Sequence, residues 1–166
     1  MAVTPQTNTT LEEIAREMAA RDNFVICGHV SPDGDCIGSQ LALMHALRSL
    51  GKQAACVLAG PRADVDEAFA YLPGFDELVP ASEYDGPCDV FVGVDVPTVE
   101  RIGDGAAIHA KAPFSITIDH HAVPTTMADL VYVDPDASAS AILIWELAGH
   151  LMGERSAEVA ASAYTG

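Results

Sequence analysis

The chain has 166 residues, of which 49% are hydrophobic and 19% charged, a balance typical of a globular protein rather than a disordered or membrane-embedded one. It carries 8 lysines and arginines against 24 aspartates and glutamates, a formal net charge of −16, which argues against binding long nucleic acid through its phosphates. Residues 1–10 are polar and contain no basic segment followed by an apolar one, so we expect a cytoplasmic protein that does not enter a membrane.

The first half of the chain is predicted to alternate between helices and strands. Thr10 and Glu13 form a capping box before one helix, and Ile37 and Leu41 recur at helical spacing in a second helix that Gly51 would end. In chain order the pattern predicts a helix over about 10–21, a strand over 24–27, a helix over 37–47, a strand over 53–58, a short helix over 66–72 and a connection over 72–80.

The second half continues the alternation. It predicts a strand over 89–95, a helix or turn that begins at Pro97, strands over 114–119 and 130–134, a helix over 137–153 closed by Gly153 and a helix over 156–164 capped by Ser156. This order predicts an α/β fold with three layers, in which helices cover both faces of a mostly parallel sheet. The length is that of one domain.

The four cysteines lack the C-x-x-C spacing of metal and redox motifs. Cys27 and Cys56 lie in apolar runs, where cysteine acts as a small hydrophobic residue. We therefore expect Cys27, Cys36, Cys56 and Cys88 to be reduced and to bind no metal.

Polar, ligand-type side chains collect directly after the predicted strands. GHVSPDGDCIGS at 28–39 follows the first strand, Asp95 ends the third, IDHH at 118–121 ends the fourth and VDPDASAS at 133–140 follows the fifth. Each group alone has a structural explanation: Asp95 as a turn or cap residue, and the two histidines as a polar corner. Because ligands bind at the carboxyl edge of open α/β sheets, we expect these groups to form one functional site.

A set of about six carboxylate and imidazole groups suits two divalent cations. Clustered carboxylates repel one another unless positive charge lies between them. Two cations would supply that charge, activate water and hold the oxygens of a phosphoryl group during in-line attack. Mixed oxygen and nitrogen ligands favour Mn²⁺, or else Co²⁺ or Mg²⁺, over a thiolate-type zinc site. The predicted reaction class is metal-dependent hydrolysis of a phosphoester or phosphoanhydride.

The four motifs GHVSPDGDCIGS, VDVPTVERIG, IDHH and VDPDASAS, in this order, resemble those of the DHH phosphoesterase family. Its members include RecJ-type exonucleases, family II pyrophosphatases and small enzymes that degrade oligoribonucleotides and phosphoadenosine phosphate. The resemblance runs from about residue 10 to residue 166. The PDGD form of the first motif is most similar to the branch of bifunctional oligoribonucleases and phosphoadenosine-phosphate phosphatases.

The resemblance implies a set of metal ligands. His29 and Asp33 would hold one cation, Asp35 and His120 the other, and Asp95 would bridge the two. Asp119 would orient the neighbouring histidines from behind the ligands.

It also implies residues that act on the substrate. His121 would face the scissile phosphate as an electrophile or proton donor, and it belongs with Asp95 and Arg101 to the implied catalytic set. Arg101 matches a family arginine after the second motif, with support of the loop as its simplest role. Ser138 and Ser140 match a small-hydroxyl segment that contacts substrate or caps a helix, whose N-terminus would favour phosphate.

The sequence departs from the family at two places. Many relatives have an asparagine shortly after the paired histidines, where AVPTT at 122–126 supplies threonines. The family's last aspartate ligand sits in a T-D-T-G-like segment after an A-x-x-Y-x-G-like run, and AASAYTG at 160–166 is the end of this chain. We therefore expect residues 1–166 to be a DHH catalytic domain truncated at its C-terminus, without the family's second, substrate-binding domain.

The expected activity is hydrolysis of short oligonucleotides or nucleoside bisphosphates such as pAp. We expect the 166-residue chain on its own to have weak activity or none. Three alternatives stay open: a phosphodiesterase of cyclic or linear dinucleotides, an inorganic pyrophosphatase, and a module that binds metal or nucleotide without catalysis. The expected partner is a short oligonucleotide or nucleotide, with no long duplex and no membrane. A homodimer stays open as well.

Overall fold

The computed structural model describes residues 7–124 and 127–165. Thr125 and Thr126, which stand near the family's asparagine position, lie outside the described residues. The strands are β1 (Phe24–Cys27), β2 (Ala54–Leu58), β3 (Val79–Pro80), β4 (Val90–Val94), β5 (Phe114–Asp119) and β6 (Leu130–Val133). The α-helices are α1 (Leu11–Ala19), α2 (Gly34–Ser49), α3 (Ala106–His109), α4 (Ser140–Met152) and α5 (Ala157–Ala163).

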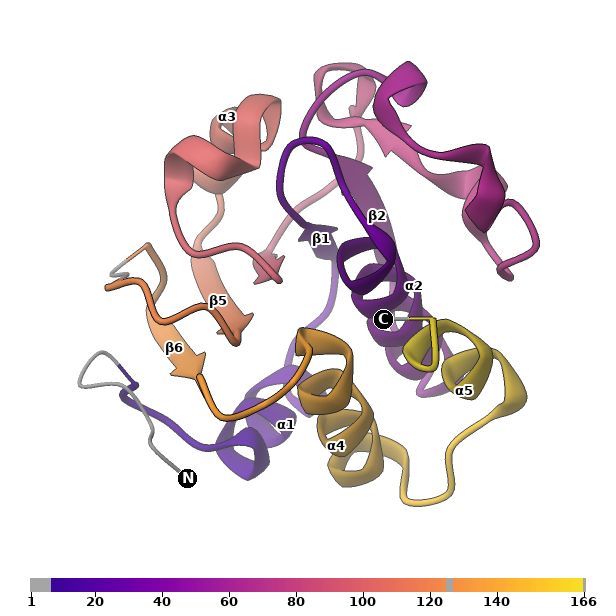
Figure 1. The fold of residues 1–166 in the computed structure, drawn as a ribbon. Coiled ribbons are helices and arrows are strands. Elements are labelled where there is room, and N and C mark those ends of the chain that lie inside the picture. Colours follow the sequence, from indigo (N-terminus) through magenta and orange to yellow (C-terminus); the bar gives the residue numbers. More distant parts are fainter. Residues whose placement is uncertain (1–6, 125–126, 166) are drawn as a thin grey trace.

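The six strands form one sheet in the order β3-β2-β1-β4-β5-β6, and every pair of neighbours is parallel. The chain first builds outward from β1 to β3 and then returns to place β4 on the other side of β1 (Figure 1). The loops that leave β1 and β4 therefore run in opposite directions. Open α/β sheets bind ligands at such a reversal, beside the carboxyl ends of the two strands.

Two hydrophobic clusters cover the two faces of the sheet. Phe24 and Ile26 of β1 belong to the larger cluster, which packs under α1, α2 and α4. Their neighbours Val25 and Cys27 point the other way, into a smaller cluster with Ile102 of the 3₁₀ segment η5 (Val99–Gly105). This alternation is the two-residue period of a strand that is buried on both sides. The predicted α/β fold with helices on both faces is confirmed.

Two predicted helices begin at other residues than expected. The second helix starts at Gly34 instead of residue 37, because the side chain of Asp33 caps it by accepting a hydrogen bond from the Cys36 amide at 3.0 Å. Half of the PDGD segment is thus helical. The predicted helix over 137–153 starts at Ser140, with Ala139 at its N-cap and no side-chain cap bond, so the expected capping by Ser138 or Ser140 is wrong.

The region between β2 and β4 also differs from the prediction. The short helix expected over 66–72 is a single 3₁₀ turn, Glu67–Phe69. The connection over 72–80 contains the two-residue strand β3, which pairs with Val57 and Leu58 at the edge of the sheet. The segment after Pro97 is η5 followed by α3.

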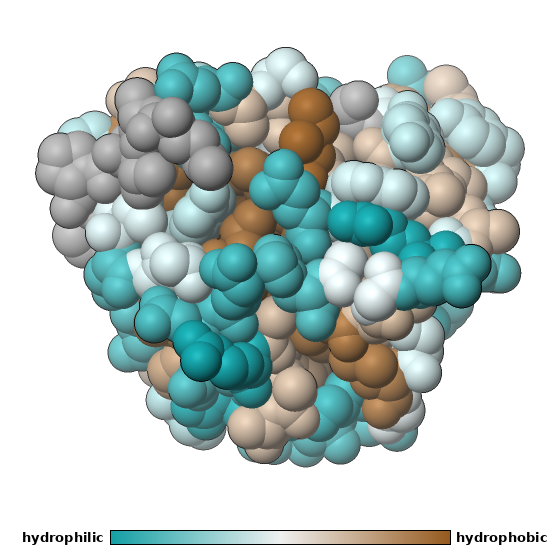
Figure 2. Space-filling view, turned by 90° about the horizontal axis from the view of Figure 1, so that it is seen from below, coloured by the Kyte–Doolittle hydropathy of each residue, from teal (hydrophilic) through white to brown (hydrophobic). Residues whose placement is uncertain are grey.

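Hydrophilic residues cover most of the face shown in Figure 2, and hydrophobic residues form small, separate areas on it. Such a surface agrees with the formal net charge of −16. Within the described residues, every helix is too short or too polar to cross a bilayer.

Candidate metal centre

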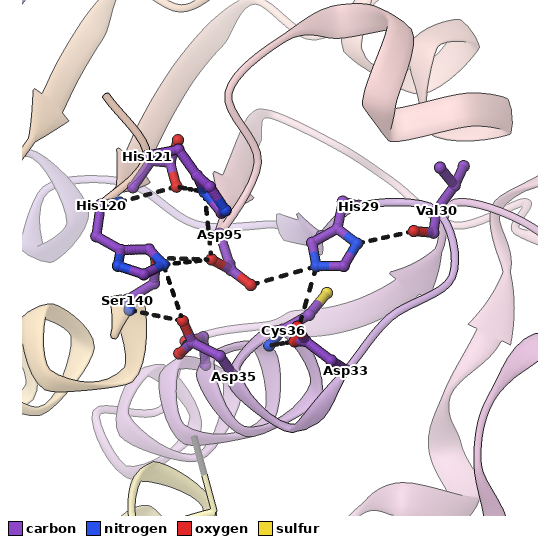
Figure 3. A network of polar contacts seen from close by, with 12 residues as sticks. His29, Val30, Asp33, Asp35, Cys36, Asp95, His120, His121 and Ser140 are labelled. Carbon is purple, nitrogen blue, oxygen red and sulfur yellow. Dashed lines mark hydrogen bonds and ion pairs between the residues drawn. The ribbon is translucent and has the colours of Figure 1, made fainter. Parts of the chain in front are cut away.

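The candidate site lies at the carboxyl ends of β1 and β4, and Asp95 is at its middle (Figure 3). Asp95 follows β4 directly, is 1% exposed and adopts a positive φ of 54°, which aspartate tolerates better than most side chains. Its amide donates to the Ile118 carbonyl of the neighbouring strand at 3.1 Å. The carboxylate of Asp95 is thereby held between two groups of predicted ligands.

The first group contains His29 and Asp33. The Nε2 atom of His29 lies 3.4 Å from Oδ2 of Asp95 and 3.7 Å from Oδ1 of Asp33. The Nδ1 atom of the same ring lies 2.8 Å from the carbonyl of Val30. Because a carbonyl can only accept, Nδ1 carries the proton, and the lone pair of Nε2 faces the two carboxylates when the ring is neutral.

The second group contains His120 and Asp35. The Nε2 atom of His120 lies 3.5 Å from Oδ2 of Asp35 and 3.5 Å from Oδ1 of Asp95. Its Nδ1 atom lies 3.2 Å from the carbonyl of Ala137, which again places the proton on Nδ1. Each oxygen of Asp95 therefore faces a different histidine.

These separations fit divalent cations. Metal–ligand bonds of about 2.0–2.2 Å hold neighbouring donor atoms roughly 3.0–3.6 Å apart. The distances of 3.4, 3.5 and 3.7 Å are close to that range and longer than strong hydrogen bonds. The two groups, with Asp95 common to both, could thus hold two cations.

The pKa values of the carboxylates also favour bound cations at this site. Burial and the nearby charge of Asp95 raise the pKa of Asp35 above its ordinary value. Burial also opposes ionisation of Asp95, but hydrogen bonds from the protonated ring of His29 and from Ser140 outweigh it and hold the pKa of Asp95 below the usual value. Two adjacent carboxylates of which one resists ionisation are a favourable environment for bound positive charge.

The N-terminus of α4 binds the Asp35 carboxylate. The amides of Ser140 and Ala141 donate to Oδ2 and Oδ1 of Asp35 at 2.8 and 2.7 Å. The hydroxyl of Ser140 donates to Oδ1 of Asp95 at 3.0 Å. The helix end that was expected to favour phosphate is thus occupied by a protein carboxylate, and this contact was not foreseen from the sequence.

His121 and Asp119 form a second pair beside the centre. Oδ1 of the fully buried Asp119 accepts from Nδ1 of His121 at 2.7 Å and from the amide of His120 at 2.8 Å. The other oxygen, Oδ2, makes no hydrogen bond within the described part of the chain. The ring of His121 is partly exposed, and its Nδ1 atom is 3.7 Å from Asp95. Asp119 therefore orients His121 and leaves its Nε2 atom for another contact.

Two predicted site residues are not brought into this cluster. The side chain of Arg101 is exposed, and its link to the first motif is made by its carbonyl, which accepts from the Val30 amide at 2.8 Å. Ser138 is exposed in the turn before α4. Asp33, by contrast, is largely exposed but stays within reach of His29, which leaves this side of the site open to solvent.

Cys36 is the residue that sequence reasoning overlooked. Its sulfur lies within 4.8 Å of ligand atoms of both His29 and Asp95, and the residue is fully buried. Burial raises the pKa of the Cys36 thiol well above its ordinary value. Its position in the first motif, directly after Asp35, was the available signal.

All residues of this site lie within the part of the chain that matches one protein family. Residues 23–166 match the DHH family, N-terminal domain. The chain belongs to the DHH family. This match confirms the resemblance predicted from the four motifs, and it covers His29, Asp95 and both histidines of IDHH.

Individual DHH relatives agree with this assignment. The bifunctional oligoribonuclease and PAP phosphatase NrnA of Thermus thermophilus is 36% identical over 148 residues, which are 89% of this chain and 43% of that protein. The crystal structure of an exopolyphosphatase-related protein from Bacteroides fragilis has a TM-score of 0.82 at 28% identity and covers 98% of this chain and 50% of that one. Exonuclease RecJ bound to manganese shares the fold, with a TM-score of 0.57 at 18% identity over 96% of this chain and 43% of its own.

The similarity to the oligoribonuclease and PAP phosphatase branch is borne out by these DHH relatives. The chain spans less than half the length of the curated NrnA proteins that it matches, 43% of the Thermus protein and 41% of that of Bacillus subtilis.

Proposed function

We propose that this chain is the metal-binding part of a phosphoesterase that hydrolyses short oligonucleotides or nucleoside bisphosphates such as pAp. The observation that supports this most strongly is the position of Asp95, whose Oδ2 lies 3.4 Å from His29 and whose Oδ1 lies 3.5 Å from His120. A single carboxylate shared in this way suits a pair of cations better than two independent ions.

In this proposal His29, Asp33 and Asp95 hold one cation, and Asp35, His120 and Asp95 hold the other. Oxygen and imidazole donors favour Mn²⁺, with Co²⁺ and Mg²⁺ as alternatives. When bound, the cations would supply an activated water and positive charge for the phosphoryl oxygens.

The protein's own groups would then orient the substrate. His121 is held by Asp119 at 2.7 Å with its Nδ1 proton committed to that contact. Its Nε2 atom is left to donate to a phosphate oxygen or to the leaving group when the ring is protonated. Because the side chain of Asp33 is largely exposed, a small phosphate could reach the proposed cations from this side.

The substrate class is proposed from charge and from similarity. A net charge of −16 disfavours a long polyanion, whereas two cations can hold one small phosphate group. The name of the Thermus relative, 36% identical, refers to oligoribonucleotides and PAP. Because this chain spans 43% of that relative, the activity of a complete protein is itself part of the proposal.

Calorimetric titration with Mn²⁺ tests the centre directly. The 166-residue chain should bind two Mn²⁺ ions, and Asp95→Asn should weaken both sites, since the asparagine amide nitrogen cannot act as the second bridging oxygen. Asp85→Asn, which changes an exposed carboxylate, is the matched control. Unchanged Mn²⁺ binding by Asp95→Asn would refute the shared-ligand centre.

Hydrolysis assays then separate the substrates. For a complete protein that contains this chain, we expect Mn²⁺-dependent release of mononucleotide from pApA and of phosphate from pAp, and loss of both in Asp95→Asn. The similarity to an exopolyphosphatase-related protein makes inorganic pyrophosphate and polyphosphate the second candidates. Cleavage of pyrophosphate with pApA left intact would favour the pyrophosphatase alternative. Faster cleavage of a cyclic dinucleotide than of pApA or pAp would favour a cyclic-dinucleotide phosphodiesterase.

A further inference from the structure

The sulfur atom of Cys36 lies close to one of the two proposed cation positions. A nitrogen of His29, the sulfur of Cys36 and a carboxylate oxygen of Asp95 all lie within 4.8 Å of one another (Figure 3). His29 is 8% exposed, Asp95 1% and Cys36 not at all. Oδ1 of Asp33 lies 3.7 Å from Nε2 of His29 and is a further carboxylate oxygen near this position.

The packing around Cys36 keeps its sulfur at this position. The residue lies in the first turn of α2, and its amide donates to Asp33 at 3.0 Å. On the opposite side the sulfur lies directly over Gly28, where an added Cβ would be 2.1 Å away. The thiol lies 4.0 Å from Gln40 Oε1, the outer limit for a hydrogen bond from sulfur.

A sulfur donor changes which cations suit the position. Mn²⁺ and Mg²⁺ prefer oxygen and nitrogen ligands, whereas soft thiolate ligands select cations such as Zn²⁺. In a tetrahedral zinc site the bonds are about 2.3 Å to sulfur and 2.0–2.1 Å to nitrogen and oxygen, so the donors lie roughly 3.5 Å apart. The donor atoms of His29, Cys36 and Asp95, which lie within 4.8 Å of one another, would close to that separation around a bound cation.

We propose that Cys36 acts as a thiolate ligand for thiophilic cations, Zn²⁺ and Cd²⁺, at the position formed by His29, Asp33 and Asp95. The thiol proton passes to solvent as the sulfur–metal bond forms, with no change in oxidation state. Cys36 thereby sets the cation preference of this position, and Zn²⁺ or Cd²⁺ displaces Mn²⁺ from it. This inference rests on the metal centre of the proposed function.

Titration of the 166-residue chain with Co²⁺ tests the inference by a readout other than activity. Bound Co²⁺ gives visible ligand-field bands with any ligands, and an additional charge-transfer band in the near ultraviolet when a thiolate is bound. We expect both features in the wild-type protein. Cys36→Ser should lose the near-ultraviolet band and keep the visible ones, while the control Cys88→Ser, which changes a half-buried thiol elsewhere, should keep both.

A competition experiment measures the preference itself. Cd²⁺ is titrated against bound Mn²⁺ in the wild-type protein and in Cys36→Ser. The ratio of Cd²⁺ to Mn²⁺ affinity should fall roughly tenfold or more in the variant, because even the loss of a residue that only supports a ligand lowers metal affinity about 10–100-fold. An unchanged ratio would count against a bond between the cation and sulfur.

The outcomes distinguish this inference from the proposed function. Visible bands without a near-ultraviolet band in the wild-type protein would refute the thiolate ligand and leave the metal centre intact. A near-ultraviolet band that persists in Cys36→Ser would likewise overturn the inference. The absence of both kinds of band would refute the metal centre and, with it, the inference. The wild-type spectrum decides these points even if Cys36→Ser fails to fold.

Discussion

The hydroxyl of Ser140 donates to Oδ1 of Asp95 at 3.0 Å, although the two residues are 45 positions apart. Both side chains are buried, and the contact joins the start of α4 to the end of β4. It connects the fourth sequence motif to the carboxylate at the middle of the site.

Replacing Ser140 by alanine should destabilise the metal-free protein. The variant removes a donor from a buried carboxylate, and a hydrogen bond to a charged group contributes about 1.5–3 kcal/mol. Urea unfolding followed by circular dichroism would measure the loss. Ser138→Ala, two residues away on the exposed turn, should change the free energy of unfolding by less than about 0.5 kcal/mol. Equal losses in the two variants would contradict a specific role for the Ser140 contact.

Mn²⁺ should stabilise the fold, and chelation should reverse the effect. A cation that binds only the native state at 100 times its Kd adds about 2.7 kcal/mol to the free energy of unfolding. The Tm should therefore rise by several degrees with Mn²⁺ and return with EDTA. In Asp95→Asn the rise should disappear, while Asp85→Asn should behave as the wild type. A full Mn²⁺-dependent rise in Asp95→Asn would show that the cation binds elsewhere.

Gly28→Ala should be destabilising because of Cys36. The new Cβ would lie 2.1 Å from the Cys36 sulfur, while its other neighbours are at 3.4 Å or more. Overpacking of this kind costs about 1–3 kcal/mol. The double variant with Cys36→Ala removes the clashing atom and should be more stable than the sum of the single effects predicts. Additive losses in this double-mutant cycle would mean that the strain of Gly28→Ala arises elsewhere.

The cysteines should react slowly with alkylating reagents in the native protein. Burial raises the pKa of Cys27 to about 12 and that of Cys88 to about 11, and the thiolate is the reactive form. Near pH 8 a thiol with a pKa of about 11 is roughly one part in a thousand thiolate. Mass spectrometry should find Cys88 labelled first, because it is half-buried whereas the other three are buried. Early labelling of Cys36 would indicate that the first turn of α2 opens.

Local patterns predicted most of the sheet and the helices. The apolar runs of β1 and β4 are recognisable because strands buried on both faces consist of consecutive hydrophobic residues, and β5 (FSITID) is recognisable by its β-branched residues. The capping box of Thr10 and Glu13 is present as predicted, since it depends on residues within one turn of the chain. β3 was missed because a two-residue strand is defined by its pairing with β2 and has no periodicity of its own.

The ligand types of the site were also visible as motifs at strand ends, and the family resemblance implied how they divide between two cations. The contacts of Ser140 and Cys36 with these ligands were not visible. The sequence placed Ser140 beside a helix and suggested a cap or a phosphate contact, whereas it contacts Asp35 and Asp95. Cys36 was assigned to the inert cysteines, and only the packing against Gly28 reveals its place near His29.

Chain order and side-chain chemistry thus sufficed for the α/β class, for the DHH family and for the identity of the oxygen and nitrogen donors, because these depend on local propensity and on motif content. The resemblance also implied two groups of donors around Asp95, but the contacts that hold them there depend on the return of β4 to the side of β1 and on the approach of α4 to α2. Such contacts join residues far apart in the chain, and their geometry is set by how the sheet and helices pack.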